Sequence, residues 1–406
     1  MSGTQRSYCR LPVVDVPFPA MPCSAVGESM LGHLRTTGYF GVRCPAVNQT
    51  LMNAAFEESR SFFALPLEAR KPLAWRDPIA NRGYYHVHTP SVGGDGDREL
   101  DSVAVHVMAR EVPHPETLRS AWLEQSEHPS LVLRSREELL AAAAAPNQWP
   151  VEAEAPHFRR TFEAYHEACT AVGEAVLTSL ALAAGLAPER LLALHSHRDH
   201  TVELKQFPAL AVPVPGSPAG AYFAALQRAE QDKLREQSAD ASLSMPRDSD
   251  SELLAQSSSR ATAGSRVGAH TDFCSLTLLA LPCNDVGGLQ ERSVDGSYHH
   301  VTRTDDVLLV HIGDMLEALL AGAVVGTKHR VVSPTSMRAW RDPRYTMQFF
   351  MSPDREAHIA PMLAVPETRA SVPLLLRSKR PQKGALCGDL VIERHDAILA
   401  SRMQLF

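Results

Sequence analysis

Cysteine pairs, long apolar runs and excess positive charge are the features that this sequence lacks. The seven cysteines are scattered and odd in number, and none forms a C-x-x-C pair. This pattern argues against a disulfide framework and favours a reducing compartment. There is no run of about 18 apolar residues, so no membrane-spanning helix is expected. The first residues, MSGTQRSYCRLPVVDV, hold no sustained apolar segment, so we expect no secretory signal and a cytoplasmic location.

The charge balance excludes two classes of partner. The formal net charge is -6 at pH 7, which gives no electrostatic basis for binding nucleic acid or an anionic membrane. Hydrophobic residues make up 44% of the chain and charged residues 21%, as in ordinary globular proteins. A length of 406 residues is enough to bury a large core, in one elaborate domain or in two joined ones.

Helical patterns dominate the first half of the chain. Asn48 is a candidate N-cap, and Gly185 is a suitable residue for ending a long amphipathic helix. That helix carries one apolar stripe with spacings of three and four residues. Helices are therefore expected over 24–37, 48–64 and 156–184, and short strands over 11–15, 38–42 and 203–207.

The segment over 213–266 differs in composition from its surroundings. It is rich in Ser, Ala, Gln, Asp, Glu and Arg, with few large apolar residues after Leu226. Such a segment has little apolar surface to bury. Because a loop of this length is unusual inside a compact domain, we expect a mobile insertion that includes an exposed helix over 221–236.

Strand signals follow one another closely after this segment. Asp295-Gly296 is typical of a hairpin turn between two strands. Many short antiparallel strands with turn signals predict a jelly roll or barrel with helices packed outside, which is an α+β fold. The expected strands are 270–281, 287–292, 298–302, 307–312, 328–333 and 345–351, and the expected helices are 315–320 and 385–403.

A His-x-Asp pair lies in the stretch from Val267 to Phe273. Side chains alternate along a strand, so His270 and Asp272 are expected to share one face. His329 lies on a separate predicted strand, and closing the sheet on itself would bring it to the same place. Two histidines and one carboxylate with open positions beside them suit an iron(II) ion that must bind dioxygen.

A second pair of side chains follows on the last predicted strand. Arg344 and Thr346 are two residues apart, so they also share a face. A guanidinium binds a carboxylate through two hydrogen bonds, and a neighbouring hydroxyl adds one donor. Inside a barrel, this pair would bind the distal carboxylate of a dicarboxylate such as 2-oxoglutarate.

These motifs, in their order along the chain, resemble the isopenicillin N synthase-like group of iron(II)/2-oxoglutarate-dependent oxygenases. The matching pieces cover most of the chain. They are Leu11-Pro-Val-Val-Asp15, Gly38-Tyr-Phe, Phe62-Phe63 with Leu65-Pro66, Arg82-Gly83-Tyr84, Pro146-Asn-Gln-Trp-Pro150, His270-Thr-Asp272, Gly287-Gly-Leu-Gln290, Ile312-Gly-Asp314, His329-Arg-Val331, and Arg344-Tyr-Thr with Phe349-Phe350 and Ser352-Pro353.

The resemblance implies a double-stranded β-helix (jelly-roll) core with flanking helices and a mixed α/β N-terminal region. It implies that His270, Asp272 and His329 bind iron(II). It implies that Arg344 and Thr346 bind 2-oxoglutarate, with dioxygen as a further substrate and ascorbate as an optional reductant. The implied regions are 1–125 (N-terminal non-haem dioxygenase region), 126–200 (connecting segment and long helix), 201–355 (jelly-roll core with the insertion over 213–266) and 356–406 (C-terminal helical segment).

Three positions depart from the pattern of the family. Thr346 stands where serine is usual and keeps the hydroxyl. Phe207 lies in a segment that often reads Asn-Tyr-Tyr-Pro, so it lacks a phenol hydroxyl that helps to hold the cosubstrate. His311 stands where asparagine is common, and we interpret it as a core histidine near the metal rather than a fourth ligand.

Three functions remain open at this point. The first is a dioxygenase that uses iron(II) and 2-oxoglutarate to hydroxylate or desaturate a small molecule. The second is an oxidase of the isopenicillin N synthase type that binds iron but does not use 2-oxoglutarate. The third is a non-catalytic binding module on the same scaffold. We expect a monomer with a small-molecule substrate and no nucleic-acid or membrane partner, and no residue is assigned to the substrate.

Overall fold

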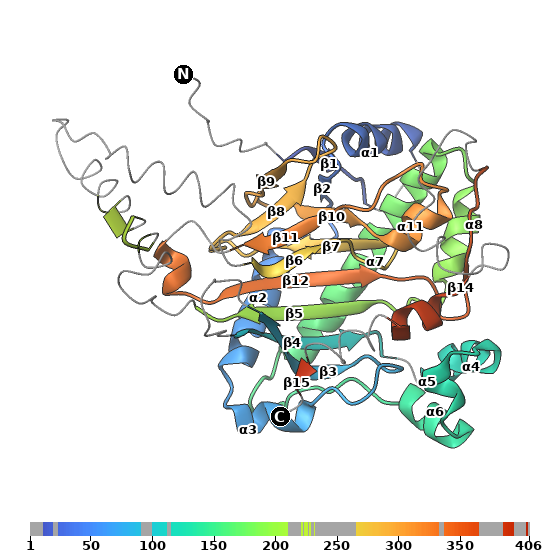
Figure 1. The fold of residues 1–406 in the computed structure, drawn as a ribbon, viewed down its shortest axis with the longest axis horizontal. Helices are drawn as coiled ribbons and strands as arrows, with labels where there is room; N and C mark the ends of the chain where they lie inside the picture. The colour runs from blue at the N-terminus through green and yellow to red at the C-terminus, as the bar shows by residue number, and fades with distance from the viewer. Residues whose placement is uncertain are drawn as a thin grey trace.

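Two β-sheets of unequal size form the centre of the protein, and helices cover the larger one (Figure 1). The structure is a computed structural model. It describes residues 11–18, 23–90, 100–111, 115–209, 265–332, 337–364, 385–393 and 403–404, and a few positions between 221 and 231.

Within the described residues, the larger sheet has nine strands, which come from both halves of the chain. Their order is β1 (Val13–Asp15), β2 (Phe40–Arg43), β10 (Leu308–Ile312), β7 (Leu276–Ala280), β12 (Arg344–Met351), β5 (Thr201–Phe207), β4 (Leu100–Ala109), β3 (Gly83–Pro90) and β15 (Met403–Gln404). The smaller sheet has the order β6 (Ser265–His270), β11 (His329–Val332), β8 (Leu289–Arg292) and β9 (Tyr298–His300). A separate pair joins β13 (His358–Ile359) and β14 (Ala385–Leu386).

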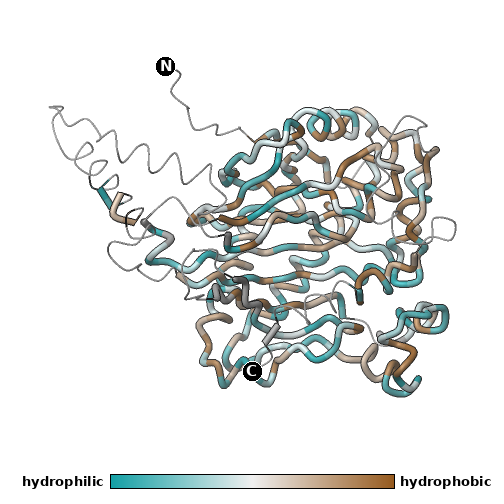
Figure 2. The backbone as a smooth tube through the Cα atoms, viewed as in Figure 1, coloured by the Kyte–Doolittle hydropathy of each residue, from teal (hydrophilic) through white to brown (hydrophobic). Residues whose placement is uncertain are grey.

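Among the described residues, most helices lie in the N-terminal half, while α11 follows β10 and residues 387–393 are also helical. The labelled helices are α1 (Ser24–Thr36), α2 (Gln49–Ala64), α3 (Leu67–Arg70), α4 (Pro115–Gln125), α5 (Pro129–Val132), α6 (Arg136–Ala143), α7 (Phe158–Ala183), α8 (Pro188–Leu192) and α11 (Asp314–Leu319). In the described part of the chain, no helix has the combination of length and hydropathy that a membrane span needs. Hydrophobic and hydrophilic positions alternate along many strands and along α1 (Figure 2).

The middle of the larger sheet is buried on both faces. Every residue of β7 and β10 is buried. On one face, Leu278 and Val310 join the main hydrophobic cluster with the side chains of α7. On the other face, Leu279 packs in a second cluster with Leu289 and Val331 of the smaller sheet. Since side chains alternate along a strand, the odd-numbered residues of β7 and β10 face the space between the two sheets.

The long helix α7 confirms the helix expected over 156–184. Its stripe residues Phe158, Phe162 and Tyr165 are almost completely buried. The helix approaches the sheet closely at Gly173, where a Cβ atom would lie 2.5 Å from Sδ of Met351 in β12. Other expected helices and strands in the first half are also confirmed, and the side chain of Asn48 caps α2 as predicted.

The prediction of one strand over 270–281 is wrong, and the difference affects where Asp272 lies. β6 ends at His270 and β7 begins at Leu276, and these two strands belong to different sheets. The residues between them cross from the smaller sheet to the larger one. Apolar periodicity does not detect such a crossing, because residues on both sides of it are strand-like and buried.

Two other boundaries differ from the sequence-based expectation. The insertion expected over 213–266, with its helix over 221–236, falls mostly outside the described residues, but its predicted end is wrong because Arg266 is a buried residue of β6. The helix expected over 385–403 is helical only at 387–393 within the described residues, since β14 precedes it and Met403 belongs to β15. The end of the insertion was misplaced because Arg266, although buried in β6, is charged like the polar residues before it.

A buried ionic cluster ties the N-terminal region to the larger sheet. Asp199, just before β5, accepts two hydrogen bonds of 2.8 Å from Nη2 of Arg119 in α4. Nη2 of Arg82 lies 3.5 Å from its Oδ1, and Nε of Arg355 lies 3.9 Å from its Oδ2. Burial by itself raises the pKa of Asp199, but the three guanidinium groups outweigh it and hold that pKa well below the usual range.

We predict that Asp199→Asn lowers the free energy of unfolding at pH 7 by about 3–5 kcal/mol, because it leaves buried guanidinium groups without their counter-ion. A carboxyl with a depressed pKa in the folded state contributes its full stability above its unfolded pKa of about 3.9 and loses it as the pH falls toward the folded value. Urea unfolding of both proteins at pH 7 and below pH 4 checks this. An Asn variant as stable as the wild type at pH 7 would refute the role of the cluster.

Candidate metal centre

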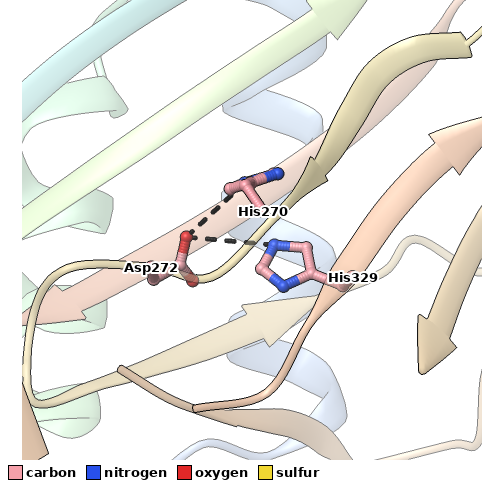
Figure 3. Close-up of side chains that lie close together, drawn as sticks. All are labelled: His270, Asp272 and His329. Atoms are coloured by element: carbon pink, nitrogen blue, oxygen red, sulfur yellow. Dashed lines mark ion pairs between the residues drawn. The ribbon is translucent and has the colours of Figure 1, made fainter. Parts of the chain in front are cut away.

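Three side chains converge between the two sheets (Figure 3). Oδ1 of Asp272 lies 3.8 Å from Nε2 of His270 and 3.9 Å from Nε2 of His329. The two imidazole rings are 4.3 Å apart at their centroids. His270 is the last residue of β6 and His329 the first of β11, and these residues are direct partners in the antiparallel pairing. The smaller sheet therefore fixes both imidazoles side by side.

Hydrogen bonds to the backbone set the tautomer of each imidazole. Nδ1 of His270 lies 2.8 Å from the carbonyl of Gly268, and Nδ1 of His329 lies 3.0 Å from the carbonyl of Thr327. Because a carbonyl can only accept, each Nδ1 carries the hydrogen and each Nε2 presents a lone pair. Burial, together with the neighbouring charge of His311, also keeps the pKa of His329 well below its usual range, so its ring is neutral.

Asp272 reaches the two histidines from outside the strand. It lies after the end of β6, so the same-face alternation expected for His270 and Asp272 is not what brings them together. Its Oδ2 accepts a 2.6 Å hydrogen bond from Oγ1 of Thr277 in β7. That bond leaves Oδ1 to face the two imidazoles. Burial raises the pKa of Asp272, but His329, His311 and His270 together lower it well below the usual value, so the group is a carboxylate.

The turn after β10 holds the segment that carries Asp272. The backbone nitrogen of Asp314 donates to the carbonyl of Asp272 at 2.8 Å, and that of Gly313 donates to the carbonyl of Ser275 at 2.9 Å. A Cβ atom at Gly313 would lie 2.0 Å from the carbonyl oxygen of Cys274. The Ile312-Gly-Asp314 motif therefore positions the carboxylate of the candidate metal site through the backbone.

We predict that Gly313→Ala weakens iron(II) binding by about tenfold or more, since the added methyl group must displace the segment that carries Asp272. Anaerobic titration with iron(II) measures the change. Gly32→Ala is the matched control, because a Cβ atom at Gly32 on α1 meets no atom within 4 Å. Unchanged iron affinity in a folded Gly313→Ala protein would show that the segment does not depend on this contact.

A buried pair lies beside the three side chains: His311 is a core histidine near them, as the sequence predicted, while its partner Glu291 was missed. Nε2 of His311 is 2.8 Å from Oε1 of Glu291, and its Nδ1 is 3.6 Å from Oδ2 of Asp272. Burial would lower the pKa of His311, but the Glu291 and Asp272 carboxylates raise it to about 10. The one signal for Glu291 in the sequence is its position directly after Gln290, which ends a motif matched to the family. In the structure, strand pairing places Glu291 directly opposite His329. His311 thus lies close to the candidate metal site, hydrogen-bonded to a carboxylate.

The side chains of Arg344 and Thr346 face the same space between the sheets. Their neighbours Tyr345 and Met347 pack in the main cluster on the helix side of β12, so Arg344 and Thr346 point the other way. Both are at most 2% exposed. Oγ1 of Thr346 accepts a 3.3 Å hydrogen bond from Gln348, which leaves its own hydrogen to be donated. The structure therefore brings these two residues to the interior, as the sequence predicted.

The guanidinium of Arg344 is buried with donors that have no acceptor. Its Nε lies 3.3 Å from Oδ1 of Asp285, but the geometry is not that of a hydrogen bond. Its Nη2 also has no hydrogen-bond partner. Burial lowers the pKa of Arg344 from its ordinary value, and nearby Arg266 lowers it further, while Asp285 opposes both. Buried donors without acceptors are costly, so this arrangement suits a ligand that brings acceptor oxygens.

Two family profiles together match most of the chain. Residues 245–353 match the sequence profile of the 2OG-Fe(II) oxygenase superfamily. Residues 11–152 match the profile described as non-haem dioxygenase in morphine synthesis N-terminal.

Curated relatives and a solved structure extend these matches. A 2-oxoglutarate-Fe(II) type oxidoreductase from Metarhizium majus is 25% identical over 333 residues, which cover 79% of this chain and 77% of that protein. A validamycin A dioxygenase from Streptomyces hygroscopicus is 26% identical over 344 residues, or 84% of this chain and 75% of that protein. The crystal structure of a full-length Neurospora crassa protein in complex with alpha-KG has a TM-score of 0.62 at 20% identity and covers 96% of this chain and 97% of that one. The structural likeness confirms the expected fold, with its double-stranded β-helix.

Proposed function

The chain belongs to the 2OG-Fe(II) oxygenase superfamily, and we propose that His270, Asp272 and His329 hold its iron(II) while Arg344 and Thr346 bind the distal carboxylate of 2-oxoglutarate. The protein is an oxidoreductase, a dioxygenase that uses iron(II), 2-oxoglutarate and dioxygen on a small-molecule substrate.

The donor set fits an iron(II) ion. The three candidate ligand atoms lie within 4.8 Å of one another, and no proton occupies either Nε2 lone pair. Two ligands with metal bonds of about 2.1 Å can be at most about 4.2 Å apart, so Oδ1 of Asp272 and each Nε2 already lie within the reach of one ion. Two imidazole nitrogens and one carboxylate oxygen are donors of the kind that would suit iron(II).

The observation that carries the cosubstrate assignment is the buried guanidinium of Arg344 with donors that lack acceptors. A planar carboxylate provides two acceptor oxygens in the geometry that a guanidinium matches. Thr346 stands beside it with a hydroxyl hydrogen to donate. The same interior space holds the candidate metal ligands, so a dicarboxylate can meet both groups.

Each side chain has a separate task in the reaction. The chemistry supplied by bound iron(II) is the oxidative decarboxylation of 2-oxoglutarate by dioxygen, coupled to hydroxylation or desaturation at a substrate C–H bond. His270 and His329 would hold the ion through neutral nitrogens, and Asp272 would lower its net charge. Thr277 holds the second oxygen of Asp272 and so keeps the carboxylate turned toward the metal. Arg344 and Thr346 orient the cosubstrate.

The two other functions left open by the sequence are not favoured. The named relatives are 2-oxoglutarate-Fe(II) oxidoreductases and dioxygenases, which do not favour an oxidase that ignores the oxoacid. The site keeps a complete set of metal ligands in the correct tautomers, which argues against a non-catalytic module.

Our proposal also includes a monomer in the cytoplasm, and a division of the sequence at residues 125, 200 and 355. The six described cysteines are free, in keeping with a reducing compartment. The regions are sequence segments of one folded unit, because β2 pairs with β10 and β4 pairs with β5. Analytical ultracentrifugation tests the monomer.

Turnover of 2-oxoglutarate without added substrate tests the proposed function. Purified protein with iron(II), ascorbate and 2-oxoglutarate is expected to form succinate slowly, and a screen of small molecules is expected to identify compounds that accelerate it. Omitting iron(II) or adding a chelator should stop succinate formation. If neither 2-oxoglutarate nor iron(II) alters oxygen uptake under any of these conditions, the proposed function is wrong.

A further inference from the structure

Arg266 is a charged side chain in the interior that the cosubstrate assignment does not yet use. We propose that Arg266 is a second cation of the 2-oxoglutarate site, acting with Arg344 on the distal carboxylate and making the site selective for dianionic oxoacids. This inference rests on the proposed role of Arg344 and adds a residue to the same site.

Both guanidinium groups contact one aromatic ring. The central carbon of Arg266 lies 5.2 Å from the centroid of the Phe207 ring, and that of Arg344 lies at the same distance. Phe207 is the direct partner of Arg344 in the pairing of β5 with β12. Arg266 is 3% exposed, and its Nη2 donates a 2.6 Å hydrogen bond to the carbonyl of Pro208. This bond holds the guanidinium beside Phe207.

An irregular register explains how Arg266 reaches this position. In the pairing of β6 with β11, the register shifts on both sides of Val331, whose partner is Val267. Strict alternation would send Arg266 and Val267 to opposite faces. Instead, Val267 packs against the cluster that contains Phe207, and Arg266 lies over the ring of Phe207. Bulges redirect side chains in this way and are over-represented next to active sites.

A second cation near Arg344 would balance the negative charge of two carboxylates there. Arg344 already lies 3.3 Å from one carboxylate, that of Asp285, which is nearly buried. A bound 2-oxoglutarate would bring another carboxylate to the same buried guanidinium, and an unmatched buried anion is strongly unfavourable. Arg266 supplies the matching positive charge.

The two cations also repel each other when no ligand is bound. Burial lowers the pKa of Arg344, and the positive charge of Arg266 lowers it further. An anion placed near both guanidiniums relieves this repulsion. Phe207 offers its ring face to both cations, so cation–π contact takes the place of the hydrogen bond that a phenol would make. Phe207, which departs from the family's pattern, and Arg266 thus form one arrangement.

The experiment compares two oxoacids that differ only at the distal end. 2-Oxoglutarate and 2-oxopentanoate have the same five-carbon chain, but the second lacks the distal carboxylate. Each is titrated into the anaerobic iron(II) protein, and binding is read from the metal-to-ligand charge-transfer absorption. In the wild type, 2-oxoglutarate is expected to bind much more tightly. In Arg266→Met, that preference is expected to fall by about 10- to 100-fold, mostly through weaker 2-oxoglutarate binding.

Three further proteins make the result interpretable. Arg266→Lys keeps the charge and is expected to keep part of the preference. Arg266→Gln removes the charge but can still donate to the Pro208 carbonyl, so it replaces the methionine variant if that protein does not fold. Arg330→Met is the matched control, since Arg330 also stacks on an aromatic ring, that of Tyr298, and bonds to Gln290 on the outer face of the smaller sheet. It is expected to keep the full preference.

The outcomes separate this inference from the proposed function. If Arg266→Met binds both oxoacids as the wild type does, or weakens both by the same factor, Arg266 is not part of the carboxylate site and the inference is overturned. If the wild type shows no charge-transfer band with 2-oxoglutarate, the proposed function itself fails.

Discussion

Replacing Asp272 with alanine is expected to abolish iron(II) binding at neutral pH and to reduce turnover by about 1,000-fold or more, because the metal provides the chemistry of the reaction. Asp272 is the one carboxylate whose oxygen faces both imidazole nitrogens, at 3.8 and 3.9 Å, among the described residues. Its loss also leaves the hydroxyl of Thr277 without its acceptor. The measurements are anaerobic iron(II) titration and succinate formation under saturating 2-oxoglutarate.

The control for this variant is an aspartate far from the interior. Asp305 has a 79% exposed side chain that pairs with Arg303, so Asp305→Ala is expected to keep wild-type iron affinity and turnover. Thermal unfolding of both variants separates loss of the site from loss of the fold. Undiminished iron binding and succinate formation by a folded Asp272→Ala protein would disprove the assignment.

Replacing Arg344 with methionine is expected to raise the KM for 2-oxoglutarate by about 100-fold while leaving iron(II) binding in place. The side chain is 2% exposed and its Nε and Nη2 have no acceptor, so we expect the distal carboxylate of 2-oxoglutarate to supply the acceptors. Because Arg344 contributes no metal ligand, the effects on cosubstrate and on metal must separate. Initial rates of succinate formation over a range of 2-oxoglutarate concentrations give the KM.

Arg344→Lys is the informative companion of this variant. It keeps the positive charge but loses the planar fork, so an intermediate KM is expected. Equal KM values for the wild type and both variants would remove Arg344 from the cosubstrate site. An equal loss of iron affinity and 2-oxoglutarate affinity would instead indicate a structural effect, since Asp285 would lose the cation beside it.

The sequence predicted that the three candidate donors would lie together, but not how the chain places them. Ligand chemistry identified His270, Asp272 and His329, and the structure brings them together. A continuous strand would place Asp272 beside His270, whereas the chain leaves the smaller sheet at His270 and enters the larger one at Leu276. The position of Asp272 depends on backbone bonds to the turn at Gly313, which lies far along the chain. A contact of that kind leaves no local periodicity to find.

The two residues that the sequence did not reveal, Glu291 and Arg266, share one property. Each is a charged side chain whose burial is stabilised by a hydrogen-bond partner distant in sequence. Glu291 is buried because His311 bonds to it across the two sheets. Arg266 has the composition of the polar segment before it, and only the irregular pairing of β6 turns it inward. Single-sequence patterns equate charge with exposure, so buried ionic partners become visible only when the strands are placed.

The position of the iron itself tests the account most directly, because two clusters of potential ligands lie side by side. His270, Asp272 and His329 form one, and Glu291, His311 and His329 form the other. Crystals grown anaerobically with iron(II) and 2-oxoglutarate would give an anomalous difference map at the iron absorption edge. We expect a single peak bonded to Nε2 of His270, Oδ1 of Asp272 and Nε2 of His329, with the oxoacid reaching Arg344. A peak bonded to Glu291 and His311 would contradict the assignment.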